Sequence, residues 1–183
     1  MIQDILIPFL LVGLAELGDK TQLAVLILST KTRAYLSLLA GVMLAFVLTD
    51  GLAILLGSFI SERVPMDYVQ VAAGLIFILF GIITLVKREE EDDEGNYELK
   101  NPFVSGFALI LVAEMGDKTQ LASALFATQY EPVLVFIGVV AALFILSTGA
   151  IFLGKLIMER INKRTISLVA GALFILIGVS FLL

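Results

Sequence analysis

The sequence contains no cysteine, no histidine and no tryptophan. Without cysteine there are no disulfides and no thiol catalysis, and without histidine there is no imidazole acid–base chemistry and no usual zinc or copper ligand set. Any metal ion that the chain binds must therefore be held by oxygen, with methionine sulfur as the one soft alternative. A basic stripe is also lacking, so nucleic acid is not expected as a partner.

Apolar residues are in excess. They make up 60% of the 183 positions, whereas a soluble domain is roughly 45–50% apolar. Six windows approach or exceed the length of helix, about 20 residues, that crosses a bilayer core: roughly 5–29, 35–60, 68–86, 103–128, 132–157 and 165–183. The N-terminal MIQDILIPFLL lacks a basic segment and a small-residue cleavage site, so we expect a retained helix. The sequence predicts an all-α membrane protein with six transmembrane helices in the lipid bilayer.

An acidic segment separates two halves of the chain. Residues 87–102, KREEEDDEGNYELKNP, contain seven acidic residues, and such charge runs are usually solvated linkers. A sensor for cytosolic cations is the alternative interpretation of this segment. We therefore expect a first three-helix repeat over 1–86, an acidic cytoplasmic linker over 87–102 and a second three-helix repeat over 103–183.

The two halves repeat one another. AELGDKTQLA, Ala15 to Ala24, returns as AEMGDKTQLA, Ala113 to Ala122, and GLIFILFG (74–81) returns as GALFILIG (171–178). This is an internal duplication. Three helices per half make the second copy cross the membrane in the opposite direction. The prediction is a 3+3 inverted-topology repeat, in which transporters hold their substrate near the membrane midplane.

Positive charge gathers at one set of helix ends, which by the positive-inside rule is the cytoplasmic set. The other set holds Arg63. The N- and C-termini are then outside, and the protein lies in the plasma membrane if its source is prokaryotic. Homo-oligomerisation stays open. The cytoplasmic residues are Lys31, Arg33, Lys87, Arg88, Lys100, Arg160, Lys163 and Arg164.

The first motif places charge in the middle of an apolar span. A carboxylate there costs several kcal/mol unless it is paired, protonated or metal-bound. On a continuous helix Glu16 shares one face with Asp19 and Gln22, and Lys20 can reach back toward Glu16. Gly18 permits close helix approach or a local helix break.

The second motif repeats this arrangement in the fourth span. Inverted symmetry would bring the two acidic faces together, so that four carboxylates, two amides and two hydroxyls line one site. The second set comprises Glu114, Gly116, Asp117, Lys118 and Gln120, and the hydroxyls are those of Thr21 and Thr119.

This set of oxygens suits a hard divalent cation. Ca²⁺ takes six to eight oxygen ligands, and Mn²⁺ also accepts carboxylate, carbonyl and water. Four carboxylates and two lysines leave a net charge of about −2, which one divalent ion neutralises if all six groups are charged. Protons compete for the same carboxylates because desolvation and mutual repulsion favour the protonated form. Competition between protons and a divalent ion for one cluster is a chemical basis for exchange.

Some polar residues allow two interpretations. Lys20 and Lys118 are either structural counter-ions or participants in proton coupling. Thr21 and Thr119 either line the site or bond to carbonyls of their own helices.

Asp50 is a further acid near the middle of the second span. Its counterpart in the second half is Ser147, or Thr148 under the other alignment of the repeats. Because neither is acidic, Asp50 is a separate candidate for a metal ligand, a proton relay or a lysine partner.

The doubled motif resembles the Gdt family of cation/proton exchangers. ELGDKT (Glu16–Thr21) and EMGDKT (Glu114–Thr119) both match E-x-G-D-[KR]-[ST]. The resemblance implies exchange of Mn²⁺ or Ca²⁺ for protons, without a cofactor. It also implies that the ion-binding acids are Glu16, Asp19, Glu114 and Asp117, supported by Thr21, Gln22, Thr119 and Gln120.

The predicted function is secondary transport that exports Mn²⁺, or Ca²⁺ as the second choice, in exchange for protons. An exporter of a small organic cation or amino acid is an alternative, which the lack of tryptophan and tyrosine in the motifs disfavours. A non-transporting membrane scaffold is another, disfavoured because each motif has two acids and one lysine. No nucleophile–base pair or cofactor motif suggests an enzyme.

Overall fold

The computed structural model describes residues 1–86, 101–115, 117–158 and 163–182, and over these ranges all regular structure is helical. Most of the predicted linker and the predicted break residue Gly116 lie outside these ranges. The helices are α1 (Ile2–Glu16), α2 (Lys20–Thr30), α3 (Tyr35–Ser61), α4 (Met66–Val86), α5 (Pro102–Glu114), α6 (Lys118–Gln129), α7 (Pro132–Met158) and α8 (Lys163–Leu182).

Two of the six apolar windows are each divided into two helices. The first window becomes α1 and α2, and the fourth becomes α5 and α6. Leu17 and Met115, the residues directly after α1 and α5, have nearly identical extended backbone angles: φ −65°, ψ 112° and φ −64°, ψ 109°. Gly18 follows Leu17 with φ 80°, a conformation that glycine adopts without the steric penalty of a Cβ. The motifs therefore lie at helix ends, where backbone groups lack helical partners.

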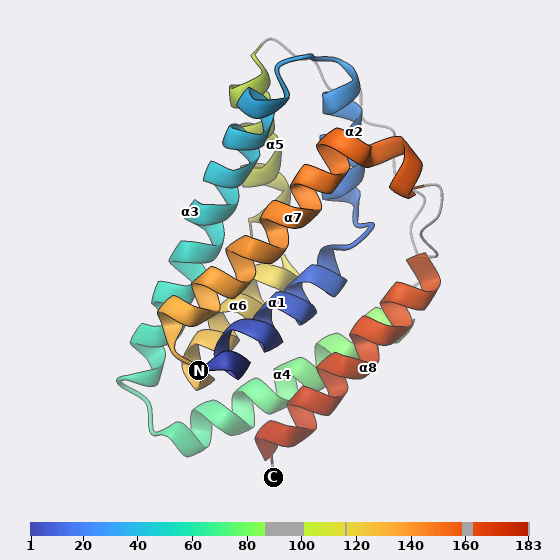
Figure 1. The fold of residues 1–183 in the computed structure, drawn as a ribbon. Coiled ribbons are helices and arrows are strands. Elements are labelled where there is room, and N and C mark those ends of the chain that lie inside the picture. The colour runs from blue at the N-terminus through green and yellow to red at the C-terminus, as the bar shows by residue number, and fades with distance from the viewer. Residues whose placement is uncertain (87–100, 116, 159–162, 183) are drawn as a thin grey trace.

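Corresponding helices of the two halves run in opposite directions (Figure 1). The chain rises through α1 and α2, descends through α3 and rises obliquely through α4. In the second half it descends through α5 and α6, rises through α7 and descends through α8. Both termini lie at the lower end of this view, and α5 begins at the upper end, near the α2–α3 turn.

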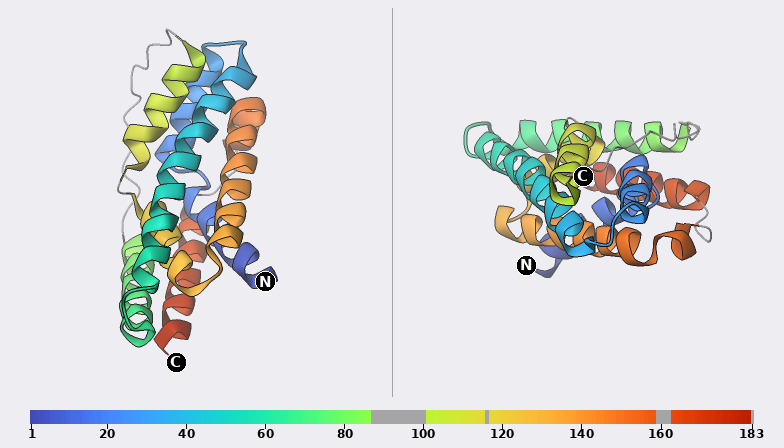
Figure 2. Two further views of the ribbon diagram at one scale, coloured as in Figure 1. Left: turned by 90° about the vertical axis from the view of Figure 1, so that its left-hand side faces the viewer. Right: turned by 90° about the horizontal axis from the view of Figure 1, so that it is seen from above.

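The halves interlock. The long helix α3 packs on α5 and α6 of the other half, and the long helix α7 packs on α1 and α2. Helices α4 and α8 lie side by side at the lower end (Figure 2). A Cβ on Gly74 would lie 2.8 Å from the carbonyl oxygen of Gly178, and one on Gly81 would lie 2.6 Å from that of Gly171. These glycines thus allow α4 and α8 the close approach typical of small-residue seams in membranes.

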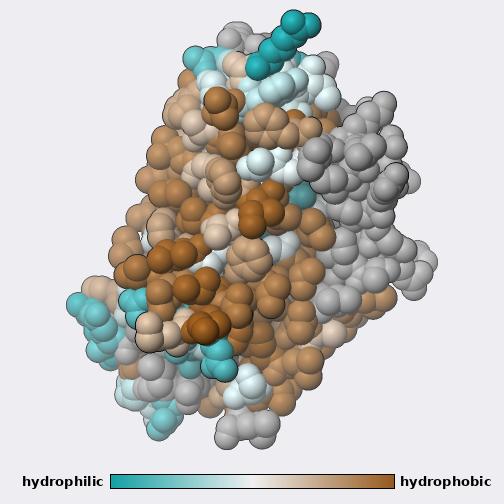
Figure 3. Space-filling view, in the orientation of Figure 1, coloured by the Kyte–Doolittle hydropathy of each residue, from teal (hydrophilic) through white to brown (hydrophobic). Residues whose placement is uncertain are grey.

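The outer surface is largely apolar, with hydrophilic residues toward its two ends (Figure 3). Large hydrophobic side chains are exposed along α3, α4 and α7. Two stretches, Tyr35–Ile60 and Pro132–Phe152, are long and apolar enough to cross a membrane, and three shorter apolar helices accompany them among the described residues. An exposed apolar surface of this extent needs lipid or protein to cover it.

Candidate functional site

Acids from both motifs converge where the two helix breaks meet. Ligand oxygens of Glu16, Asp19 and Asp117 all lie within 4.8 Å of one another. Glu16 ends α1, Asp19 lies in the first break and Asp117 precedes α6, so the cluster needs both halves of the chain. Carboxylates at this spacing can share one divalent cation.

The two motif glutamates are deeply buried, with 1% of Glu16 and 3% of Glu114 exposed. Each accepts a long hydrogen bond of 3.4 Å from the threonine five residues later, Thr21 for Glu16 and Thr119 for Glu114. The threonine hydroxyls therefore face the acids. Within the described part of the chain, Oε1 of Glu16 has no hydrogen-bond partner, which is costly for a buried carboxylate oxygen and leaves it available to a ligand.

Lys118 bonds across the two halves. Its Nζ donates to Oδ2 of Asp19 at 2.7 Å, and both side chains are partly exposed. Within a continuous helix, Lys20 could instead reach back to Glu16, and Lys118 to Glu114 in the same way. The helix breaks remove that spacing, so Lys118 begins α6 and reaches the other motif. The side chain of Lys20 lies outside the described residues.

The two motif glutamines bond to backbone near the breaks. Oε1 of Gln22 accepts a hydrogen bond from the amide of Gly18 at 3.1 Å. Nε2 of Gln120 donates to the carbonyl of Thr49 at 3.0 Å. Gln22 thus holds the turn in the first break, and Gln120 ties α6 to α3.

Asp50 lies in α3 beside the second motif and is 4% exposed. Its Oδ1 accepts a hydrogen bond of 2.7 Å from the hydroxyl of Ser123, which is fully buried. The sequence left Asp50 as a metal ligand, a proton relay or a lysine partner. The hydrogen-bond partner observed for its side chain is a serine. Sequence reasoning missed Ser123, although it is the first position after the repeated stretch where a polar residue replaces an apolar one, Val25.

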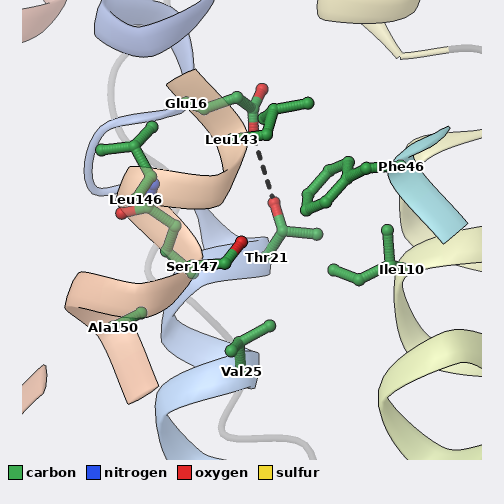
Figure 4. Close-up of a pocket in the computed structure, with 10 residues that line it drawn as sticks. Glu16, Thr21, Val25, Phe46, Ile110, Leu143, Leu146, Ser147 and Ala150 are labelled. Atoms are coloured by element: carbon green, nitrogen blue, oxygen red, sulfur yellow. Dashed lines mark hydrogen bonds between the residues drawn. The ribbon is translucent and has the colours of Figure 1, made fainter. Parts of the chain in front are cut away.

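A small cavity adjoins Glu16 on the α2 side (Figure 4). Its volume of about 10 Å³ gives room for about one water molecule. Thr21 donates to Glu16 at one edge, and Ser147 projects from α7 toward Thr21. Gln22 also lines this cavity, so its polar groups come from the first motif and from α7.

Comparison with known proteins gives one family. A sequence model described as "Divalent cation/proton antiporter GDT1" matches residues 4–92 and 102–183. A Vibrio cholerae protein named "Putative manganese exporter" is 29% identical over 171 residues, covering 92% of this chain and 85% of that protein. A GDT1-like protein of Synechocystis is 31% identical over 192 residues, covering 93% and 92%. The chloroplastic protein PAM71 of Arabidopsis thaliana is 26% identical over 197 residues, covering 91% and 53%. No solved structure matches the chain.

Proposed function

The chain belongs to the GDT1 family of divalent cation/proton antiporters, and we propose that it exports Mn²⁺ in exchange for protons through the cluster of Glu16, Asp19 and Asp117. Membership makes the chain an integral membrane transporter rather than an enzyme, and the ions it moves are substrates rather than cofactors. The single observation that carries the proposal is the convergence of acids from both motifs within 4.8 Å.

Manganese is the proposed substrate, with Ca²⁺ next. Support comes from the oxygen-only ligand set, which suits both ions, and from the Vibrio relative, which is named for manganese export. The direction of transport is proposed from that same name.

The proposed membrane arrangement is six spans in a 3+3 inverted repeat. The spans are α1 with α2, α3, α4, α5 with α6, α7 and α8. The opposite directions of corresponding helices and the apolar outer surface support this arrangement. The proposed orientation puts the α2–α3 turn, with Lys31 and Arg33, in the cytoplasm with the acidic linker, and both termini outside.

The proposed mechanism uses the charges of the cluster. A divalent cation binds when Glu16, Asp19 and Asp117 are ionised, and Glu114 adds a nearby negative charge that acts on Glu16. Protons that neutralise Glu16 and Glu114 weaken this attraction and release the cation. Alternating access then comes from movement of one half against the other around the shared site.

Transport by the purified chain in proteoliposomes tests the proposal. Mn²⁺ flux is expected to follow an imposed pH gradient and to reverse when the gradient is reversed. Glu16→Gln is expected to abolish the flux, whereas Glu62→Gln, the same change at an exposed glutamate after α3, retains it. Mn²⁺ flux that ignores both the gradient and Glu16→Gln excludes this function.

A further inference from the structure

Six of the eight helices repeat one another's packing across the two halves. Helix α3 packs on α5 and α6, and its counterpart α7 packs on α1 and α2. Gly41 of α3 lies close against the backbone carbonyl of Phe103. In the other half Gly138, the counterpart of Gly41, lies close against the carbonyl of Ile5, and Ile5 is the counterpart of Phe103. An exchange of the two halves would therefore leave these contacts in place.

Helices α4 and α8 form a pair with a symmetry of its own. The repeated stretches 74–81 and 171–178 make Gly171 the counterpart of Gly74, and Gly178 the counterpart of Gly81. A Cβ on Gly74 would lie 2.8 Å from the carbonyl oxygen of Gly178. A Cβ on Gly171 would lie 3.0 Å from that of Gly81. Each contact is the image of the other, as in an isologous interface, so the pair would also keep its packing if the halves were exchanged.

The α4–α8 pair is placed unequally on the other six helices. It packs on α1 through α8 and on α6 through α4, toward the end of the molecule where both termini lie (Figure 1). Within the described part of the chain, the equivalent packing of α4 on α5 and of α8 on α2 does not reach a comparable extent. The pair therefore occupies one of two positions that the duplication makes equivalent.

Buried aromatic rings fill the contact between the pair and α6. The ring centroid of Phe77 in α4 lies 4.9 Å from that of Phe126 in α6 and 5.9 Å from that of Phe174 in α8. At most 1% of each of these side chains is exposed. Phe126 lies about one turn beyond Ser123, which bonds to Asp50 beside the second motif. The rings thus close the space along α6 between the acid cluster and the end that holds both termini, the outer end of the proposed orientation.

We propose that α4 and α8 move together as one gate between these two positions. In the position described, Phe77 packs on Phe126 and closes the route from the acid cluster to the outer end. In the other position the pair leaves α1 and α6 and packs on α5 and α2. Phe174 then meets Leu28, the counterpart of Phe126, and closes the route to the end where α5 follows the linker. The inference rests on the proposed function and narrows the movement between the halves to the last helix of each.

Cross-linking tests the gate, because the chain has no native cysteine. The double variant Tyr130→Cys with Phe181→Cys joins the end of α6 to α8, at rings whose centroids are 6.2 Å apart. The matched control, Tyr35→Cys with Phe152→Cys, joins α3 to α7 at rings 5.6 Å apart. All four side chains are at least partly exposed, so a short bis-methanethiosulfonate linker reaches both pairs. Mn²⁺ flux is measured in proteoliposomes before linking, after linking and after reduction.

We expect the link from α6 to α8 to lower Mn²⁺ flux several-fold, with recovery after reduction, because it holds the gate in one position. The control link should leave the flux unchanged, because α3 and α7 both belong to the part that stays in place. Flux that survives the first link overturns the gate, since the pair then need not move. Flux that the control link stops as fully also overturns it, since whole halves then move against each other.

Spin-label distances give a second measurement that leaves the buried rings intact. Leu36 of α3 and Val133 of α7 are equivalent exposed positions, and so are Leu79 of α4 and Leu176 of α8. After the gate moves, the distance from Leu176 to Leu36 should equal the distance from Leu79 to Val133 in the first position. The distance between Leu36 and Val133 should stay constant. Pulsed electron paramagnetic resonance measures these distances at acidic and alkaline pH, with Ca²⁺ in place of the paramagnetic Mn²⁺.

A single set of Leu176 distances under all these conditions overturns the gate. Mn²⁺ flux through the unmodified chain separates this proposal from the proposed function. Intact flux with a pair that does not move removes only the gate, whereas absent flux removes the transport function itself.

Discussion

Lys118 and Asp19 form an ion pair of 2.7 Å, although they belong to different halves of the duplicated chain. The pair connects the beginning of α6 to the break between α1 and α2. Asp19 also belongs to the acid cluster, so the lysine is a tethered cation on a carboxylate that we propose for metal binding. If Asp19 binds the ion as we propose, Lys118 has to release Asp19 first.

Lys118→Met should therefore increase the affinity of the cluster for Mn²⁺. Removal of a competing positive charge a few ångströms away is expected to tighten binding roughly tenfold. Transport should slow, because a more tightly held ion leaves less readily. Isothermal titration measures the affinity, and Lys31→Met, at an exposed lysine after α2, serves as the control. Binding that weakens in Lys118→Met assigns the lysine a supporting role instead.

The Asp50–Ser123 bond predicts a coupled effect on stability. Ser123→Val leaves a buried carboxylate without its hydroxyl partner and is expected to cost about 1–3 kcal/mol. The double variant Asp50→Ser with Ser123→Val reproduces the residues of the other half and should recover much of that loss. Thermal unfolding in detergent checks both. If the two substitutions act additively, the bond does not contribute as described.

Gly18 offers a test of the first helix break. Gly18→Ala forces a Cβ into a left-handed conformation, which costs roughly 1–2 kcal/mol, and should lower both thermal stability and Mn²⁺ transport. Gly13→Ala is the matched control in α1, because its Cβ would lie at an ordinary 3.6 Å from that of Ala142. Equal thermal stability and equal Mn²⁺ transport in the two variants would show that the break does not depend on the left-handed conformation of Gly18.

Much of the helix layout is predictable from hydrophobicity. Four apolar windows correspond to α3, α4, α7 and α8 within a few residues, because each is one uninterrupted helix. The all-helical class follows from the same windows. The division of the other two windows depends on the backbone geometry at Leu17, Gly18 and Met115, which hydrophobicity does not register.

Contacts between the motifs were less predictable, for a physical reason. Spacing arguments assumed a continuous helix in which Glu16 and Asp19 share a face, but α1 ends at Glu16. The partner of Lys118 and the bond from Ser123 to Asp50 join residues far apart in sequence. Tertiary packing of α6 against α3 and the first break sets them, and periodicity within one helix carries no information about such pairs.

The central claim is that the two motifs build one metal site and not two. Calorimetric titration of the purified chain with Mn²⁺ tests it most directly, alongside Asp19→Asn, Asp117→Asn and, as the control, Asp67→Asn at an exposed position of α4. We predict one Mn²⁺ per chain, lost in Asp19→Asn and equally in Asp117→Asn, and unchanged in Asp67→Asn. Two independent ions per chain, or one ion that survives either substitution in the cluster, would contradict the shared site.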